Sequence, residues 1–241
     1  MSFPLSHYVP VWLVELGGII VLVAVIMGVA FKLRNWVKVL GPVAYAAKHA
    51  GFLKNLPAVL KISITQNDVI VDSKLRLVMH QFMFWGFILC GVATSLVWIT
   101  GTAEKARTLT DIPKIFGNIG GVLLLVGCSY VLLRLVTVKE FRRNRAVGDL
   151  LFFLSLFIVT ITGFTTQYYR MTADSAMALT NYAIHLAANV ILLGAAPFTH
   201  FFHAVSTPFL RLFTVSLKPE ELKQLKAEEI LNTLEDVLKK R

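Results

Sequence analysis

The feature that most constrains this chain is a series of five apolar runs, each long enough to cross a lipid bilayer. A helix needs about 20 residues to span the hydrocarbon core, and the runs cover residues 12–31, 77–103, 115–137, 150–169 and 178–205. The chain is 56% hydrophobic and only 16% charged, with a mean hydropathy of +0.68. An ordinary soluble protein carries about 25% charged residues. The sequence therefore predicts an all-α membrane protein with a five-span domain over residues 1–215.

The basic residues in the loops orient these helices, because Lys and Arg accumulate on the cytoplasmic side. The segment between the first two runs and the loop after the third run are both rich in them: Lys32, Arg34, Lys38, Lys48, Lys54, Lys61, Lys74, Arg76, Lys139, Arg142, Arg143 and Arg145. The other two loops are short and nearly balanced. We therefore expect the N-terminus outside and the C-terminus inside, in the inner (cytoplasmic) membrane. The net charge is +10, and the basic residues lie between the apolar runs. We therefore expect them to contact lipid headgroups, and we expect no nucleic acid partner.

Two segments outside the runs are also expected to be ordered. Residues 35–64 mix apolar side chains with spaced lysines, which is typical of an amphipathic segment lying in the membrane interface, although Pro42 and Pro57 interrupt it. The tail, residues 216–241, begins with Pro-Glu-Glu and ends with Lys-Lys-Arg, a pattern that favours a helix. We expect this cytoplasmic helix to dock on a partner protein or to lie on the bilayer.

The histidines inside the runs indicate the chemistry, because ionisable residues in a membrane are costly and rare. His185 and His203 are 18 residues apart in the fifth run. In a continuous helix this is five turns, about 27 Å, with both side chains on one face. His80 lies about one turn after the cytoplasmic start of the second run, at the predicted depth of His203. Because imidazole is the usual protein ligand of haem iron, His80 and His203 could hold one haem. The alternative is a hydrogen bond that joins the two helices.

The cysteines narrow the kind of cofactor. The sequence contains no Cys-x-x-Cys-His motif, so a haem here would be of the b type, bound without thioether bonds. Its two cysteines, Cys90 and Cys128, both lie inside apolar runs. They exclude a disulfide framework and a four-cysteine metal site. Iron–sulfur clusters are therefore expected on a partner and not on this chain.

A set of residues spread over positions 12–213 carries a resemblance to a known family: Asp68-Val69, Arg76, His80, Gly86-Phe87, Gly117-Asn118, Asp149, Gly163-Phe164, His185, Pro197-Phe198, His203 and Pro208. With these residues the chain resembles the membrane cytochrome b family that includes the gamma subunit of respiratory nitrate reductase and the membrane subunits of heterodisulfide-reductase-type complexes. It is most similar there to the membrane subunits of the sulfate-reducer complexes Qmo, Tmc and Hmc. Five spans with the N-terminus outside are also what this family implies.

The resemblance implies a role for each histidine. His80 and His203 would bind a haem on the cytoplasmic side, and His185 would serve an outer haem. The nitrate reductase subunit has a second outer histidine at the position that is Cys90 here. Three interpretations stay open: an outer haem with an unusual sixth ligand, Cys90 or His7; a five-coordinate haem on His185; or no outer haem, with His185 in a quinone site.

Several polar residues near these histidines are candidates for secondary contacts. His200 is interpreted as a contact to a haem propionate or to quinone, or as an interfacial histidine. Arg134, at the inner level with Arg142 and Arg143, would donate charge-assisted hydrogen bonds to propionates or to lipid headgroups. Two alternative quinone sites are predicted: Gln167, Tyr168 and Arg170 at the outer end, or Arg76 and Asp149 with His200 at the inner end.

Glycines cluster in the second and third runs, at Gly86, Gly91, Gly117, Gly120 and Gly121. In membranes such residues usually let helices pack closely. They can also clear room for the face of a porphyrin, and their location near the depth of the histidines favours the haem interpretation.

Together these features predict a haem b subunit that passes electrons between membrane quinone or menaquinone and partner subunits. The partners would be a cytoplasmic iron–sulfur subunit of heterodisulfide-reductase type, a periplasmic multihaem cytochrome c, or both. The chain would not be a complete enzyme alone. One alternative is the di-haem gamma subunit of a formate dehydrogenase or hydrogenase, which usually has four spans. Another is a haem-free transporter or assembly factor whose histidines pair or conduct protons.

Overall fold

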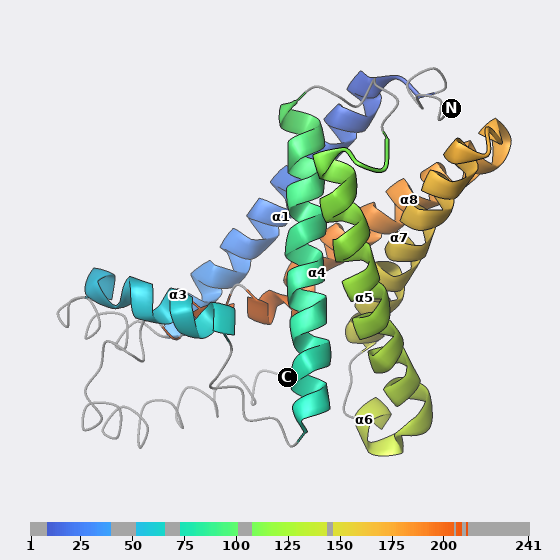
Figure 1. The fold of residues 1–241 in the computed structure, drawn as a ribbon. Coiled ribbons are helices and arrows are strands. Elements are labelled where there is room, and N and C mark those ends of the chain that lie inside the picture. The colour runs from blue at the N-terminus through green and yellow to red at the C-terminus, as the bar shows by residue number, and fades with distance from the viewer. Residues whose placement is uncertain are drawn as a thin grey trace, which may run out of the picture. The chain divides into compact units, whose positions relative to one another are not determined.

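The computed structural model describes residues 9–39, 52–65, 73–100, 108–143, 147–204, 206–208 and 211, which are almost entirely helical. Five of the helices are long and apolar enough to cross a membrane (Figure 1): α1 (Val11–Val39), α4 (Lys74–Ile99), α5 (Ile112–Thr137), α7 (Val147–Met171) and α8 (Ser175–Ala195). Within the described ranges there is no strand. The predicted class, an all-α protein with five membrane-crossing helices, is confirmed, and the chain is a multi-pass membrane protein.

The shorter elements lie between or after the long helices: η2 (Phe52–Asn55), α3 (Leu56–Thr65), α6 (Lys139–Arg143), η4 (Ala196–Phe198) and η5 (His200–Phe202). Part of the predicted interfacial segment is therefore helical. Pro57, which we expected to interrupt it, is instead the second residue of α3, where its missing N–H costs no hydrogen bond. Residues 40–51 and the predicted tail helix lie outside the described residues.

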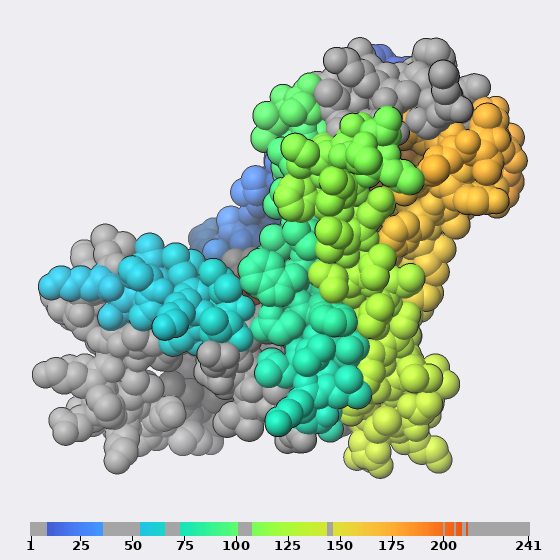
Figure 2. All heavy atoms as spheres, in the orientation of Figure 1, coloured from blue at the N-terminus to red at the C-terminus, as the bar shows by residue number. Residues whose placement is uncertain are grey.

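The chain divides into two compact units, and the division passes through α1. The first unit contains Met1–Val25 and Val71–His200; the second contains Ile26–Ile70 and Phe201–Arg241. In the first unit α4 packs on α5, α5 on α7 and α7 on α8 (Figure 1), and the atoms of α4 and α5 meet in the space-filling view (Figure 2). In the second unit, Val59 of α3 is 2% exposed, and the Arg211 guanidinium donates to the Ser63 hydroxyl at 3.4 Å.

Glycines let α4 and α5 approach closely. A Cβ atom added at Gly86 would lie 2.8 Å from the backbone oxygen of Gly120, and one added at Gly120 would lie 2.8 Å from the backbone oxygen of Gly86. The two helices therefore touch backbone to backbone, which is the common use of small residues in membranes. The expectation that these two glycines clear room for a porphyrin is wrong, because the neighbouring helix fills that space.

The close contacts continue across the first unit. A Cβ atom at Gly121 of α5 would lie 2.8 Å from the ring of Phe164 on α7, and one at Gly163 would lie 3.4 Å from the ring of His185 on α8. Through these contacts, one layer crosses α4, α5, α7 and α8 and contains Gly86, Gly121, Gly163 and His185. We refer to it as the glycine layer, and it serves as the reference for depth in this unit.

The turn between α7 and α8 is tight. Thr172 and Ala173 follow the end of α7, and Ala173 has a φ of 61°, in the left-handed region. Asp174 then caps α8, because its carboxylate accepts a hydrogen bond from the backbone N–H of Met177 at 3.0 Å. Such a cap satisfies a donor that the first helical turn leaves without a partner. The turn fixes the antiparallel register of α7 and α8.

The fifth helix ends earlier than the sequence predicts. We expected one helix over residues 178–205, but α8 ends at Ala195 and two short 3-10 segments follow. Thr199, between them, is extended with φ −107° and ψ −179°. Pro197 lies at this break and has no N–H for a helical hydrogen bond. The argument that His185 and His203 lie on one face of a continuous helix is therefore wrong.

The predicted orientation can be tested with reporter fusions. Enzymes that fold only outside the cytoplasm are expected to be active when fused after Thr108 or Thr172, in the two loops that are poor in basic residues. Fusions after Ala58 or Asn144, in the basic segments, are expected to be inactive. A cytoplasmic reporter at the same four sites serves as the control. The opposite pattern in both series would reverse the assignment of the inner and outer faces.

Candidate functional site

His185 is the best-defined polar group inside the first unit. It lies on α8, its side chain is half-buried, and its Nδ1 lies 2.9 Å from the backbone oxygen of Val159 on α7. The hydroxyl oxygen of Thr162 lies 3.2 Å from the same nitrogen. The carbonyl of His185 accepts a further hydrogen bond, from the Asn189 amide at 2.8 Å. The imidazole is thus held by backbone and side-chain groups of a neighbouring helix.

These contacts fix the tautomer of the ring. The Val159 carbonyl can only accept a hydrogen bond, and the Thr162 hydroxyl already donates to the backbone oxygen of Ile158 at 2.6 Å. Both groups that face Nδ1 are therefore acceptors, so Nδ1 carries the proton and donates to them. In a neutral imidazole the other nitrogen, Nε2, then has the free electron pair. A hydrogen bond from Nδ1–H thus determines that Nε2 can act as a metal ligand or as a hydrogen-bond acceptor.

Gly163 makes room for this ring. Its Cα faces the imidazole, and an added Cβ would lie 3.4 Å from Cε1 and 3.7 Å from Nδ1 of His185. Nε2 is not within 4 Å of that position. The edge with Nδ1 and Cε1 therefore packs against α7, and Nε2 is directed away from it. Nε2 thus lies on the part of this half-buried ring that does not face Gly163.

Cys90, the position that would oppose His185 by resemblance, faces α5. Its thiol approaches the backbone oxygen of Gly117 at 3.9 Å, and a Cβ at Gly120 would lie 2.9 Å from its Sγ. Cys90 therefore acts as a small packing residue at the contact of α4 and α5. In the described part of the first unit, no second histidine lies in the glycine layer. An outer haem with two axial ligands does not fit these residues. His7 lies outside the described residues.

His80 lies on α4, half-buried, six residues before Gly86. Because an α-helix rises 1.5 Å per residue, His80 is displaced by about 9 Å along the helix axis from the layer that contains His185. A planar haem between helices takes its two ligands from one depth. The structure thus separates His80 from His185, and one ring cannot bind both.

His203 belongs to the second unit and follows the break after α8. Its side chain is exposed. The backbone of His200 lies in the 3-10 segment η5, so α-helical geometry does not relate its direction to that of His203. The equal depth of His80 and His203 was inferred from a continuous fifth helix and has lost that support. Their pairing stays a prediction.

Arg134 is placed by aromatic rings at the end of α5. Its guanidinium lies 4.4 Å from the ring centroid of Phe141 on α6 and 6.0 Å from that of Tyr130. Cation–π contacts of this kind stabilise by about 0.5–1 kcal/mol at exposed sites. The neighbouring Arg142 and Arg143 are exposed. The guanidinium of Arg134 is thus held against Phe141 of α6. Contacts of Arg134, Arg142 and Arg143 with propionates or headgroups stay a prediction.

The outer quinone candidates are not brought together as one group. The Gln167 amide oxygen accepts a hydrogen bond from the ammonium group of Lys114 on α5 at 2.8 Å. Tyr168 is 61% exposed, and its ring packs edge-on against Tyr169. Arg170 is half-buried in the last turn of α7. Lys114, which was not among the predicted site residues, therefore also lies at this end of the bundle.

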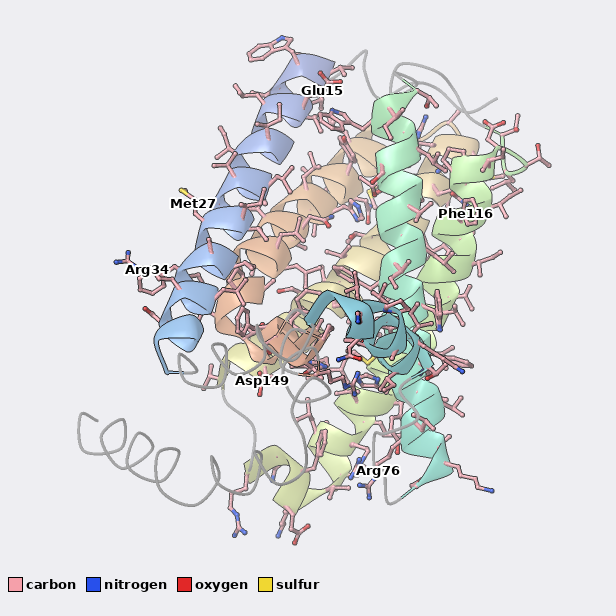
Figure 3. The ribbon with its side chains drawn as sticks, turned by 90° about the vertical axis from the view of Figure 1, so that its left-hand side faces the viewer. Glu15, Met27, Arg34, Arg76, Phe116 and Asp149 are labelled. Atoms are coloured by element: carbon pink, nitrogen blue, oxygen red, sulfur yellow. The ribbon has the colours of Figure 1, made fainter. Side chains whose placement is uncertain are left out.

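The inner candidates lie at one end of the first unit. Arg76 lies in the first turn of α4 and Asp149 in the first turn of α7 (Figure 3). Glu15, near the start of α1, lies at the opposite end (Figure 3). Asp149 is only 6% exposed, whereas Arg76 is half-buried. The two residues thus lie in the first turns of α4 and α7, and a quinone site there stays a prediction.

Sequence reasoning missed the residues that hold His185, although a signal was available. Helices α7 and α8 fold back on each other at residues 172–174, and counting equal distances from this turn brings position 185 opposite positions 159–163. Another residue of α7, Thr166, stands out for a different reason. It is 7% exposed, and its buried hydroxyl has no hydrogen-bond partner among the described residues. Other threonines of α7 donate to the carbonyl four residues earlier, as Thr160 does at 2.8 Å.

Comparison with known proteins gives weak but consistent similarities. The chain is 25% identical over 179 residues to one subunit of the dihydromethanophenazine:CoB–CoM heterodisulfide reductase of Methanosarcina acetivorans, which covers 66% of this chain and 67% of the relative. It is 24% identical over 162 residues to the corresponding protein of Methanosarcina barkeri, covering 61% and 62%. The chain thus spans about two thirds of the length of these relatives. No solved structure matches.

These similarities support a membrane subunit of an electron-transfer complex of the heterodisulfide-reductase type. A family model covers most of the chain: the model CitB, described as citrate utilization protein B, matches residues 43–220. That range includes α4 to α8 and all the described histidines. The chain belongs to the CitB (citrate utilization protein B) family.

Proposed function

We propose that this protein is a haem b-containing subunit of a respiratory complex in the inner membrane. It transfers electrons between a reduced membrane carrier and partner redox subunits. The observation that carries the electron-carrier part of the proposal is the imidazole of His185, which is held inside a helical bundle by Val159 and Thr162 and has Nε2 left as an acceptor. Membrane bundles rarely keep an ionisable residue without a functional reason. The similarity to the heterodisulfide reductase of Methanosarcina supports the same class of function.

The haem would be held by His80 and His203. The resemblance to the membrane cytochrome b family assigns this role to them, and imidazole is the usual protein ligand of haem iron. His80 lies within a membrane-crossing helix, and Arg134 would lie near the same end. A bound b haem would supply one-electron transfer, while the protein sets its orientation and potential.

The carrier would be a quinol such as menaquinol, or a dihydrophenazine of the kind named for the Methanosarcina relatives. In both classes the reduced form bears an O–H or N–H group at its redox ring. The partners would be a cytoplasmic iron–sulfur subunit of heterodisulfide-reductase type, a periplasmic multihaem cytochrome c, or both. Proteins that copurify in mild detergent would distinguish these partners.

Reduction by a carrier tests this function. The purified full chain, oxidised and kept without oxygen, is mixed with a short-chain naphthoquinol or with a dihydrophenazine. We expect the α band of a reduced b haem to appear, with an amplitude that dithionite then brings to its maximum. The oxidised carriers serve as controls and should leave the spectrum unchanged. A protein with no b-type band after dithionite would instead support the haem-free transporter or assembly factor.

A further inference from the structure

The lone-pair nitrogen of His185 is an acceptor directed away from its supporting helix. Nδ1 donates to Val159 and Thr162, so the proton that a neutral imidazole carries is already used. Nε2 points away from Gly163, and the ring is half-buried, so a molecule arriving beside α8 can reach it. Two kinds of group suit such a nitrogen: a metal ion that accepts its electron pair, or a hydrogen-bond donor.

The surroundings of His185 disfavour the metal. In the described residues of the first unit, the glycine layer offers no second imidazole, and the Cys90 thiol is turned to α5. No group of three or more His, Cys, Asp or Glu side chains gathers anywhere in the described ranges. The space between Gly86 of α4 and Gly120 of α5 is also filled by the atoms of these two helices.

We infer that Nε2 of His185 accepts a hydrogen bond from the O–H or N–H group of the reduced carrier, and that this residue is not a haem ligand. This inference rests on the proposed function and specifies the site and the redox form that it recognises. An oxidised quinone or phenazine presents only acceptors at its redox ring, which Nε2 in this tautomer cannot satisfy. The site is therefore expected to bind the hydrogen-bearing form more tightly than the oxidised form.

Thr162 is the positioning residue of this site. The hydroxyl of Thr162 donates its proton to the backbone oxygen of Ile158, so its oxygen accepts a hydrogen bond from Nδ1 of His185. In the other tautomer Nδ1 would carry no proton and would face two acceptors. Thr162 therefore disfavours that tautomer. Thr166 provides a matched control one turn further along the same helix. Its hydroxyl is buried and has no partner in the described residues, so its loss removes no hydrogen bond.

Binding of four compounds to the full chain in detergent tests the inference by anaerobic titration calorimetry. The compounds are a short-chain naphthoquinol, its quinone, a dihydrophenazine and its phenazine. We expect tighter binding of the reduced member of at least one pair, which also identifies the carrier class. His185→Leu should weaken that binding about tenfold, the loss of one hydrogen bond, and leave the oxidised form and the haem content unchanged. Thr162→Val should weaken it several-fold, whereas Thr162→Ser and Thr166→Val should not.

The outcomes separate this inference from the proposed function. Loss of one haem per chain in His185→Leu would make His185 a ligand and overturn the inference, as would unchanged binding of the reduced carrier in that variant. If His185→Leu does not fold, the comparison of Thr162→Val with Thr166→Val decides, and equal binding overturns the inference. A wild-type chain that contains no haem but still prefers the reduced carrier would contradict the proposed function alone.

Discussion

Alanine in place of Gly86 is expected to lower the free energy of unfolding by about 1–3 kcal/mol, the usual cost of overpacking a close contact. The new Cβ would lie 2.8 Å from the Gly120 carbonyl oxygen and 2.9 Å from the backbone nitrogen of Leu124. These are backbone atoms, which cannot rotate away as a flexible side chain can. The helices α4 and α5 must therefore separate. Thermal unfolding of the detergent-solubilised protein, followed by size-exclusion chromatography, measures the loss.

Gly91→Ala on the same helix is the matched control. A Cβ there meets nothing within 4 Å, and alanine is the better helix former by about 1 kcal/mol in a helix interior. This variant should be as stable as the wild type or slightly more stable. If Gly86→Ala and Gly91→Ala unfold at the same temperature, the backbone contact between α4 and α5 does not stabilise the protein.

Loss of the haem is the second large effect that we expect. Replacing either His80 or His203 with Ala should abolish the low-spin spectrum of a haem with two histidine ligands, because one imidazole is then missing from the iron. The reduced visible spectrum and the electron paramagnetic resonance of the oxidised protein measure it. His49 lies between the first two apolar runs and not inside one, so His49→Ala should leave both spectra unchanged. A complete bis-histidine spectrum in both single variants would contradict the assignment.

The spans could be predicted from the sequence because their signal is local. A membrane-crossing helix needs an apolar run of sufficient length, and the predicted end of the third run, residue 137, is also the end of α5. The predicted end of the fifth run, residue 205, is wrong, and the reason is also local. Hydropathy continues past Ala195, but Pro197 ends the regular helix there. A window that counts apolar residues does not detect one missing hydrogen-bond donor.

The sequence indicates which residue types are candidates for the site, but it does not indicate their geometry. His185 stands out because ionisable residues are rare in apolar runs. The hydrogen bonds of His185 with Thr162 and with the Val159 carbonyl depend on how α7 packs against α8. Every residue has a backbone carbonyl, so the residue type at position 159 does not indicate this contact. Cys90 shows the converse: its sequence position suggested a ligand, and its contacts with Gly117 and Gly120 make it a packing residue.

The number of b haems per chain tests the central claim most directly. The purified full chain is denatured in alkaline pyridine, and its haem is measured from the reduced spectrum and divided by the amount of protein from amino-acid analysis. We predict one haem b per chain, because His80 and His203 supply one pair of imidazoles and the described residues of the first unit place no second histidine at the depth of His185. A value of zero in protein purified from haem-replete cells would contradict the claim that this chain is a cytochrome b subunit.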